Sequence, residues 1–369
     1  MAHNPKRLSR LRAVMGEQGI DVLYVRELSN ISWATGFERV FDDEPAHALV
    51  VSARNCVLHT DSRYFDAMKS AAADTDIEVD NSRMAHSAVL AQVSDCIDGD
   101  IVRVGIEDSM PLAEYRALQR TFEGRAIDLV ELSGFVEELR QVKDESEITA
   151  MRKAQSITDA AFANIIAFMK PGMTEREVQL QLDRYMYEEG AEGLAFGTIV
   201  ATGAHAASPH AIPGETKLAF GDAVVMDFGA RYAGYCSDMT RTVFVGEPSD
   251  EARRAYGAIR RANEECEAML RAGLSGADVH QHAEAILEEE GFGGAMGHSL
   301  GHSVGIDIHE APNLSPRNQK ALCAGNVVTV EPGIYLTGKF GMRLEDYGVV
   351  RDTSYEVFTQ STHEMIIIS

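Results

Sequence analysis

Apolar residues recur with two different spacings along the first third of the chain. The segment from Leu8 to Gly19 has the spacing of an amphipathic helix and ends in glycine. Short apolar runs predict strands at 20–25, 46–53, 55–61, 77–80 and 101–107, and helix-like segments lie between some of them, at 63–74 and 86–97. Strands that alternate with helices are typical of α/β domains, and we predict one over residues 1–140.

The pattern changes at the charged segment ELRQVKDESE, from Glu138 to Glu147. This segment opens a long helix, so we place a boundary there and predict a second domain over residues 141–369. The single tryptophan, Trp33, lies in NISWATGF, which we interpret as a loop with Trp33 as its hydrophobic anchor.

The second domain contains an internal repeat. Segment 171–193 resembles segment 272–294, and the residue numbers of each matching pair differ by 101. The pairs are Gly172 and Gly273, Val178 and Val279, and Gly190 and Gly291. A long helix precedes each copy (145–169 and 250–270) and strands follow it, so the unit is helix, helix, strands, made twice. Such a duplication predicts a pseudo-symmetric α+β domain with a site between its halves.

Composition and charge exclude some classes of partner. The 369 residues include 57 acidic and 34 basic side chains, for a formal net charge of −23. Such a surface repels phosphate backbones, so we predict no nucleic-acid partner. No apolar run reaches the ~18 residues of a membrane span, and the N-terminus has no apolar signal segment, so we predict no membrane partner. Five cysteines without a CxxC pair are typical of reduced thiols, and we predict a cytoplasmic protein.

Five metal-ligand side chains of the second domain lie in apolar, strand-like runs. They are Asp227 in VVMDFGA, Asp238 in YCSDMTRTVFV, His302 in GHSLGHSVGIDIHE, Glu331 in VVTVEPGIYL and Glu345 in GMRLEDYGVV. An ionised carboxylate among apolar neighbours is costly to bury unless a positive charge compensates it. Metal ions supply such charge, so the five runs predict a site for two metal ions.

The spacing of these residues adds two expectations. Asp227 and Asp238 are an odd number of positions apart, so we expect them to lie directly opposite each other in a hairpin. His298 and His302 have the spacing of the zinc-binding helix HExxH, but no glutamate follows His298 and glycines recur every four residues. We therefore predict an extended segment there, in which the backbone can approach a substrate closely.

The runs MDFGARYAGYCSDMTRTVFVG, GHSLGHSVGIDIHEAP, VTVEPGIYL and GMRLEDYGVV resemble the signature segments of the pita-bread metallopeptidases. That family contains Xaa-Pro aminopeptidase (aminopeptidase P), prolidase and methionine aminopeptidase. The resemblance is strong over residues 143–369, and the first domain more loosely resembles the creatinase/prolidase type of N-terminal domain. It implies an α+β protein with a C-terminal pita-bread fold and a smaller N-terminal α/β domain.

At matching positions, the resemblance implies a ligand set for two divalent metal ions. Asp227 would chelate one ion, Asp238 and Glu345 would bridge both, and His302 and Glu331 would hold the other. A water or hydroxide between the ions would attack the scissile carbonyl. Mn²⁺ is the expected metal, although Co²⁺, Fe²⁺ and Zn²⁺ accept the same ligands.

The resemblance also implies roles for residues around the metals. Glu331 would move protons, His210 would position the scissile peptide, and His309 would contact its carbonyl or oxyanion. His298 would line the site, and Arg343 would contact the ligands from outside the metal shell. One position departs from the family, because Ser303 follows His302 where glycine is common.

The resemblance implies an exopeptidase that acts on peptides with proline at the second position. It also implies that the protein forms a homodimer. An Xaa-Pro aminopeptidase is favoured over an Xaa-Pro dipeptidase (prolidase), because Asn313 stands where resembling dipeptidases have an arginine. Arg343 could still bind a substrate carboxylate, so both functions stay open. The remaining alternatives are a metal-free amidinohydrolase such as creatinase and a non-catalytic binding protein of the same fold, neither of which needs the full ligand set.

Overall fold

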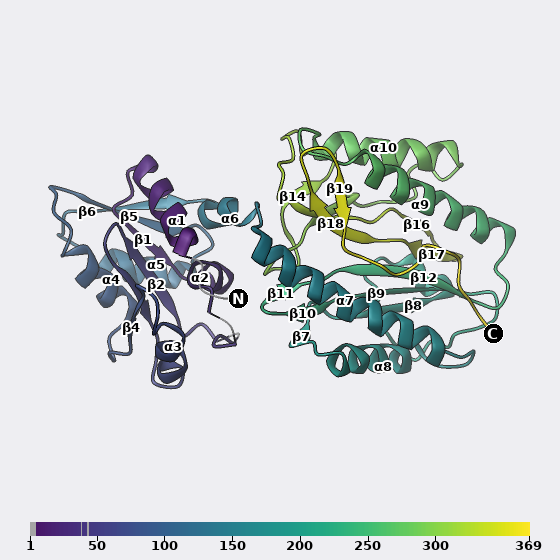
Figure 1. The fold of residues 1–369 in the computed structure, drawn as a ribbon, viewed down its shortest axis with the longest axis horizontal. Coiled ribbons are helices and arrows are strands. Elements are labelled where there is room, and N and C mark those ends of the chain that lie inside the picture. Colours follow the sequence, from purple (N-terminus) through teal and green to yellow (C-terminus); the bar gives the residue numbers. More distant parts are fainter. Residues whose placement is uncertain (1–4, 38, 43) are drawn as a thin grey trace. The chain divides into compact units, whose positions relative to one another are not determined.

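The chain folds as two compact units, Met1–Arg140 and Gln141–Ser369 (Figure 1). The computed structural model describes residues 5–37, 39–42 and 44–369. No helix in this described part of the chain is both long and apolar enough to cross a membrane. The five cysteines all lie in that part and form no disulfide; Cys56, Cys236 and Cys266 are buried, whereas Cys96 and Cys323 are exposed.

The first unit is built on a six-stranded sheet. Its strands are β1 (Val22–Val25), β2 (Ala48–Ser52), β3 (Cys56–His59), β4 (Glu78–Asp80), β5 (Val102–Glu107) and β6 (Ile127–Leu132), in the order β4-β3-β2-β1-β5-β6. Only β2 runs antiparallel to its neighbours among these strands. Parallel neighbours need crossover connections, which usually contain helices. The helices are α1 (Pro5–Gln18), α2 (Leu28–Thr35), α3 (Phe65–Ala71), α4 (His86–Ser94), α5 (Leu112–Thr121) and α6 (Phe135–Arg140).

Trp33 lies in helix α2, so its interpretation as a loop residue is wrong. The helix ends at Gly36, whose φ of 66° is left-handed. The indole is buried; Arg7 donates a hydrogen bond to the Trp33 carbonyl (3.1 Å), and the guanidinium carbon lies 5.7 Å from the ring centroid. Tertiary packing therefore overrides the modest helix propensity of the surrounding Asn, Ser and Thr residues.

Four long helices of the second unit display the repeat. The first copy contains α7 (Glu145–Phe168) and α8 (Glu175–Glu188), and the second contains α9 (Asp250–Met269) and α10 (Gly276–Glu289). Thr174 and Ser275 cap α8 and α10 alike, because each side chain accepts a hydrogen bond from the third backbone N–H of its helix. Within this unit, the two helix pairs cover opposite sides of the strands (Figure 1).

The strands of the second unit form four separate sheets. They are β7 (Gly193–Leu194), β8 (Ile199–Thr202), β9 (Ala223–Phe228), β10 (Ala230–Tyr232), β11 (Tyr235–Cys236), β12 (Met239–Val245), β13 (Gly301–Ser303), β14 (Glu310–Leu314), β15 (Val327–Val330), β16 (Gly333–Leu336), β17 (Phe340–Arg343), β18 (Asp346–Val350), β19 (Tyr355–Val357) and β20 (Ile367–Ile368). The larger sheets have the orders β20-β12-β9-β8 and β14-β13-β15-β18-β19, one from each half. The smaller sheets are β11-β10-β7 and β16-β17.

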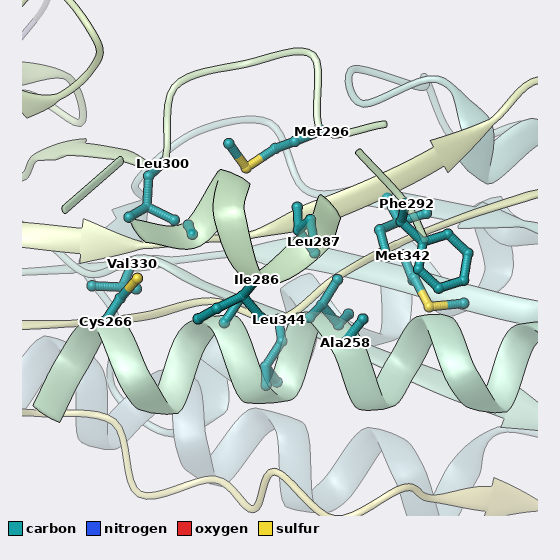
Figure 2. Packing of buried hydrophobic residues seen from close by; sticks show 14 of the residues in the cluster. Ala258, Cys266, Ile286, Leu287, Phe292, Met296, Leu300, Val330, Met342 and Leu344 are labelled. Carbon is teal, nitrogen blue, oxygen red and sulfur yellow. The ribbon is translucent and has the colours of Figure 1, made fainter. Parts of the chain in front are cut away.

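Each half of the second unit has its own apolar core. In the second half, Cys266 on α9 packs with Ile286 and Leu287 on α10 against strand residues that include Val330 and Met342 (Figure 2). The first half has an equivalent cluster between α7, α8 and strands β8, β9 and β12. A fully buried aliphatic side chain contributes about 1.5–3 kcal/mol to the stability of the fold. The two cores therefore hold in place the strands that carry the polar residues described next.

Candidate metal centre

All five candidate ligands line one pocket of about 490 Å³ in the second unit. Asp227 lies in β9, and Asp238 directly precedes β12. His302 is the central residue of β13, Glu331 directly follows β15, and Glu345 lies between β17 and β18. The first two residues come from the first copy of the repeat and the other three from the second, so the pocket joins the two halves. The segment of His298 and His302 contains no helix, as the glycine spacing predicted.

The hairpin between Asp227 and Asp238 has a different register from the one expected. Asp227 lies opposite Thr240 in the pairing of β9 with β12, so the prediction that it opposes Asp238 is wrong. The hairpin turns at Ala233 and Gly234, which both have positive φ (49° and 79°). A two-residue turn of this kind favours glycine, which moves the turn one residue beyond the expected midpoint. Both aspartates nevertheless reach the pocket.

The closest approach is among Asp238, His302 and Glu345. One nitrogen or oxygen of each side chain lies within 4.8 Å of the others. His302 Nε2 is 3.5 Å from Asp238 Oδ2 and also 3.5 Å from Glu331 Oε1. These separations exceed the usual length of a direct hydrogen bond. Asp238, His302 and Glu345 lie close enough together to hold a metal ion.

Hydrogen bonds orient the ligand atoms of His302 and Glu331. His302 Nδ1 lies 3.1 Å from the carbonyl oxygen of Ser303, which can only accept, so Nδ1 carries the proton and Nε2 keeps its lone pair. The Thr329 hydroxyl accepts from the backbone N–H of His302 (3.0 Å) and lies 3.2 Å from Glu331 Oε1, to which it donates. Burial also lowers the pKa of His302 to about 4. The imidazole is therefore held in the neutral form that binds metals.

The four carboxyl groups all have raised pKa values, with burial as the largest cause. The pKa of Glu331 rises to about 8. The pKa values of Asp238 and Glu345 lie well above the ordinary range, because neighbouring carboxylates add repulsion to the effect of burial. Four ionised acids in one pocket thus need compensating positive charge.

The donor set fits divalent metal ions. Asp227 Oδ1 is buried and has no hydrogen-bond partner among the described residues, although buried polar atoms nearly always have one. A metal ion satisfies such an oxygen. Carboxylate oxygens together with an imidazole nitrogen suit Mn²⁺, Fe²⁺, Co²⁺ and Zn²⁺. The positive charge of such ions would compensate the negative charges of the four acids.

Arg343 contacts the carboxylates and extends a hydrogen-bond network away from them. It is buried and donates through Nε to Thr240 Oγ1 (2.9 Å), through one Nη to the Tyr335 hydroxyl (2.6 Å), and through the other Nη to Asp227. The Tyr335 hydroxyl lies 3.2 Å from His298 Nε2. Sequence reasoning missed Thr240 and Tyr335. The signal for Tyr335 was its place in the run after Glu331, since a buried tyrosine hydroxyl needs a partner.

The remaining predicted residues line the same pocket. They are His210, His298 and His309. The rings of His302 and His309 are 4.5 Å apart at an interplanar angle of 73°. Burial lowers the pKa of His298 to about 4, so this ring is neutral and can accept a hydrogen bond from the Tyr335 hydroxyl. The structure thus brings together every residue predicted for the site.

One part of the pocket wall is apolar and was not predicted. It includes Phe196, Ile199 and Ile308, with Pro209 beside His210. Phe196 and Ile199 lie beside other apolar residues in the segment LAFGTIVA, so nothing in the local pattern distinguishes them from ordinary core residues. Pockets for small ligands commonly combine such apolar walls with a few polar groups that fix orientation.

Comparison with known families assigns both units. Residues 149–352 match Metallopeptidase family M24, and residues 7–142 match the Creatinase/Prolidase N-terminal domain. An uncharacterized peptidase of Bacillus subtilis, YqhT, is 35% identical over 365 residues, which cover 98% of this chain and 100% of that protein.

Two solved structures are similar over almost the whole chain. A structure described as an Xaa-Pro dipeptidase from Bacillus anthracis has a TM-score of 0.90 and 35% identity, covering 98% of this chain and 99% of its own. An X-Pro aminopeptidase from Thermotoga maritima has a TM-score of 0.87 and 34% identity, covering 98% of this chain and 100% of its own.

Proposed function

The chain belongs to metallopeptidase family M24, and on that basis we propose that it hydrolyses the peptide bond between an N-terminal residue and a following proline. The family and the pita-bread fold expected from the sequence are confirmed. The observation that carries the proposal is the convergence of Asp227, Asp238, His302, Glu331 and Glu345 with three further histidines on one pocket. A creatinase-like or non-catalytic protein has no need of this complete set.

We assign the five converging side chains to two divalent metal ions, with Mn²⁺ as the first choice. Such ions, when bound, lower the pKa of water toward neutrality and stabilise negative charge that develops on a carbonyl oxygen. The neutral His302, with Nε2 free of protons, is already in the state that binds a cation. Each acid contributes oxygen donors and the negative charge that balances the ions.

The protein's own groups then handle the peptide and its protons. The nitrogen of proline carries no hydrogen within a peptide, so it must gain a proton to leave as an amine. Glu331 lies in the pocket with its Oε1 3.5 Å from His302 Nε2, and in this proposal its carboxylate carries a proton from the attacking water to the proline nitrogen. In this proposal His309, beside His302, donates to the scissile carbonyl, and His210 positions the peptide.

Aminopeptidase activity is favoured over strict dipeptidase activity by the charges of the pocket wall. A dipeptidase must bind a free C-terminal carboxylate, which an arginine does well. Arg343 is the only lysine or arginine among the described residues that line the pocket, and it already donates to Thr240, Tyr335 and Asp227. Asn313 lines the pocket and is uncharged. Both descriptions occur among similar solved structures, and dipeptidases or prolidases are the more frequent, so the choice of an aminopeptidase rests on the pocket wall alone.

The test compares an Xaa-Pro dipeptide with the matching Xaa-Pro-Yaa tripeptide, using the Mn²⁺-loaded protein. We expect the tripeptide to have the higher kcat/KM. Asn313→Arg is expected to shift the preference toward the dipeptide by roughly 10-fold, because a charge-assisted hydrogen bond contributes about 1.5–3 kcal/mol. Asn313→Gln, which adds no charge, is the matched control. A strong preference of the unmodified protein for the dipeptide would reverse the assignment.

A further inference from the structure

The loop that carries His210 is tied at both ends to one buried carboxylate. Glu175 is the first residue of α8, and its side chain is fully buried. Its Oε1 accepts hydrogen bonds from the backbone N–H of Thr202 (2.9 Å) and from His205 Nδ1 (2.7 Å). Its Oε2 accepts from the backbone N–H of Gly214 (3.0 Å). Thr202 ends β8, and Gly214 follows His210, so Glu175 bridges the start and the end of the loop.

Backbone contacts close the loop around these bonds. The N–H of Glu175 donates to the Thr216 carbonyl (2.9 Å), and the N–H of Arg176 donates to the Gly214 carbonyl (3.1 Å). Between its fixed ends the loop forms the 3-10 turn Gly203–Ala207 and then passes through Pro209 and His210, both of which line the metal pocket. The carboxylate therefore acts on the segment that forms this wall.

The other side of the loop rests on the strand that carries Arg343. A Cβ atom at Gly341 in β17 would come within 1.8 Å of the Ala206 carbonyl oxygen, so only glycine permits this approach. The loop is thus held between α8 on one side and β17 on the other. A shift of the α8 attachment would therefore move His210 relative to Arg343 at the end of β17.

The internal repeat shows that the architecture does not require this carboxylate. The position equivalent to Glu175, 101 residues further on, is Gly276, the first residue of α10. A Cβ atom there would lie 2.2 Å from the carbonyl oxygen of Asn313, which also lines the pocket. Both halves therefore place the start of the second helix against a pocket wall. At this position, only the first half has a carboxylate, and that carboxylate holds the loop of His210.

We propose that Glu175 is a positioning residue that holds Pro209 and His210 at the metal pocket through Thr202, His205 and Gly214. The kinetic part of this inference rests on the proposed peptidase function. A carboxylate has only acceptors, whereas glutamine has one acceptor oxygen and a donor NH₂ group. Glu175→Gln therefore sets a donor against one of the loop's N–H donors and releases one end of the loop.

The experiment compares Glu175→Gln with Glu177→Gln, an exposed glutamate in the same helical turn whose carboxylate accepts hydrogen bonds from Thr174. In the Mn²⁺-loaded protein, Glu175→Gln is expected to lower kcat/KM by roughly 10- to 100-fold, the range expected for a misplaced binding group. Hydrogen exchange of residues 203–216 should rise in the same variant. Glu177→Gln should leave both quantities near those of the unmodified protein.

A double-mutant cycle with His210→Ala tests whether Glu175 acts through His210. If it does, adding Glu175→Gln to His210→Ala changes kcat/KM by less than about 3-fold, because the two losses share one cause. The absorption spectrum of the Co²⁺-substituted protein should be unchanged by Glu175→Gln, since the metal ligands stay in place. Additive losses, or unchanged hydrogen exchange, would overturn the proposal.

A milder variant tests the same proposal if Glu175→Gln does not fold. His205→Ala removes one of the three donors, and is expected to raise loop exchange and lower kcat/KM by about 3-fold, with His205→Gln restoring part of both. A loop that exchanges as slowly in His205→Ala as in the unmodified protein contradicts the inference. If the unmodified protein cleaves no Xaa-Pro peptide, the proposed function fails, while the exchange measurements still test the loop.

Discussion

The guanidinium group of Arg343 donates a hydrogen bond to Asp227, and its other nitrogens bond to Thr240 and Tyr335. Thr240 in turn donates to Glu345 Oε2 (2.6 Å). The Arg343 guanidinium thus orients two candidate metal ligands, Asp227 directly and Glu345 through Thr240, one from each half of the second unit. Removing a group that orients metal ligands commonly lowers metal affinity by about 10- to 100-fold, even though every ligand stays in place.

Replacing Arg343 by lysine should weaken the metal centre without removing a ligand. Lysine keeps the charge but not the planar fork that reaches three partners, so we expect metal affinity and kcat/KM to fall by about 10- to 100-fold. Competition with a chelator and steady-state kinetics measure the two quantities. Arg184→Lys on the exposed face of α8 is the control. Equal metal affinity in Arg343→Lys and Arg184→Lys would refute the role given to Arg343.

Metal binding should release protons at neutral pH. Burial raises the pKa of Glu331 to about 8, so this acid is largely protonated at pH 7 when no metal is bound. Burial and the neighbouring carboxylates also raise the pKa values of Asp238 and Glu345. We expect Mn²⁺ to displace at least about one proton per chain. Calorimetric titration in buffers with different ionisation enthalpies measures this number. Proton release near zero at pH 7 would mean that the acids are already ionised without metal.

The raised pKa values of the same four acids also predict how metal removal affects the stability of the fold. All four have raised folded-state pKa values, so their contribution to stability is lost as pH rises above the ordinary carboxyl range. For Glu331, this loss extends from about pH 4.5 to about pH 8. Metal ions that bind the ionised acids cancel this loss. Removal of metal should therefore lower the melting temperature more at pH 8 than at pH 6. A difference that is the same at both pH values would contradict the assignment of these acids as ligands.

Glu267 should destabilise the protein at alkaline pH. Its pKa rises to about 9, chiefly through burial and then through repulsion from Asp346, and its Oε1 is buried without a hydrogen-bond partner in the described part of the chain. The raised pKa means that stability falls as pH increases from about 4.5 to 9. Glu267→Gln should therefore stabilise the fold by about 1–3 kcal/mol at pH 8, with little gain near pH 5.

Urea unfolding of the Glu267→Gln variant at both pH values measures this gain. Glu288→Gln, which changes an exposed glutamate of α10, is the matched control and should leave the free energy of unfolding nearly unchanged. A gain in Glu267→Gln that is as large at pH 5 as at pH 8 would show that the charge of Glu267 is not the cause.

Lys143 forms a buried ion pair whose loss should be costly. Its Nζ lies 3.0 Å from Glu310 Oε2 and 3.0 Å from Ser303 Oγ, and its side chain is 1% exposed. Lys143→Met leaves the Glu310 carboxylate without this cation, so we expect the free energy of unfolding to fall by about 3–5 kcal/mol. Adding Glu310→Gln should recover part of it. Lys153→Met, exposed on α7, is the control, and an equal loss in both lysine variants would rule out the ion pair as the cause.

The contact of Lys143 with Ser303 also gives a structural reason for a sequence departure. Glycine is common after the metal-ligating histidine in this family, and Ser303 stands in that place. Its hydroxyl is fully buried and contacts a lysine, so it does not narrow the pocket and Ser303 is not among the residues that line it. The sequence alone could not show this, because Lys143 and Ser303 are far apart in the chain.

The repeat and the candidate site were predictable from the sequence for different reasons. The repeat was predictable from local signals, such as the helix caps Thr174 and Ser275. A helix favours such a capping residue wherever the helix lies in the fold. The convergence of the five candidate ligands on one pocket was predictable, because an acid in an apolar strand is costly to bury unless a positive charge compensates it. The opposition of Asp227 and Asp238 was not predictable from spacing, since positive φ at Ala233 and Gly234 decided the register.

Some contacts of the site could not be foreseen because they are set by tertiary structure. The bond between Tyr335 and Arg343 joins neighbouring strands, but nothing in either segment specifies the partner. The same holds for Trp33 in the first unit, where tertiary packing favours a helix in a segment that we expected to be a loop. The link from Glu175 to Gly214 joins the start of a helix to a loop 39 positions away.

The division of the five candidate ligands between the two copies of the repeat has a consequence for biosynthesis. Asp227 and Asp238 emerge from the ribosome well before His302, Glu331 and Glu345. A nascent chain that has produced only the first copy cannot assemble the full donor set, however well that copy has folded. If these residues hold the ions as proposed, tight metal binding requires that both copies have been translated and have docked, and it therefore reports a completely folded site.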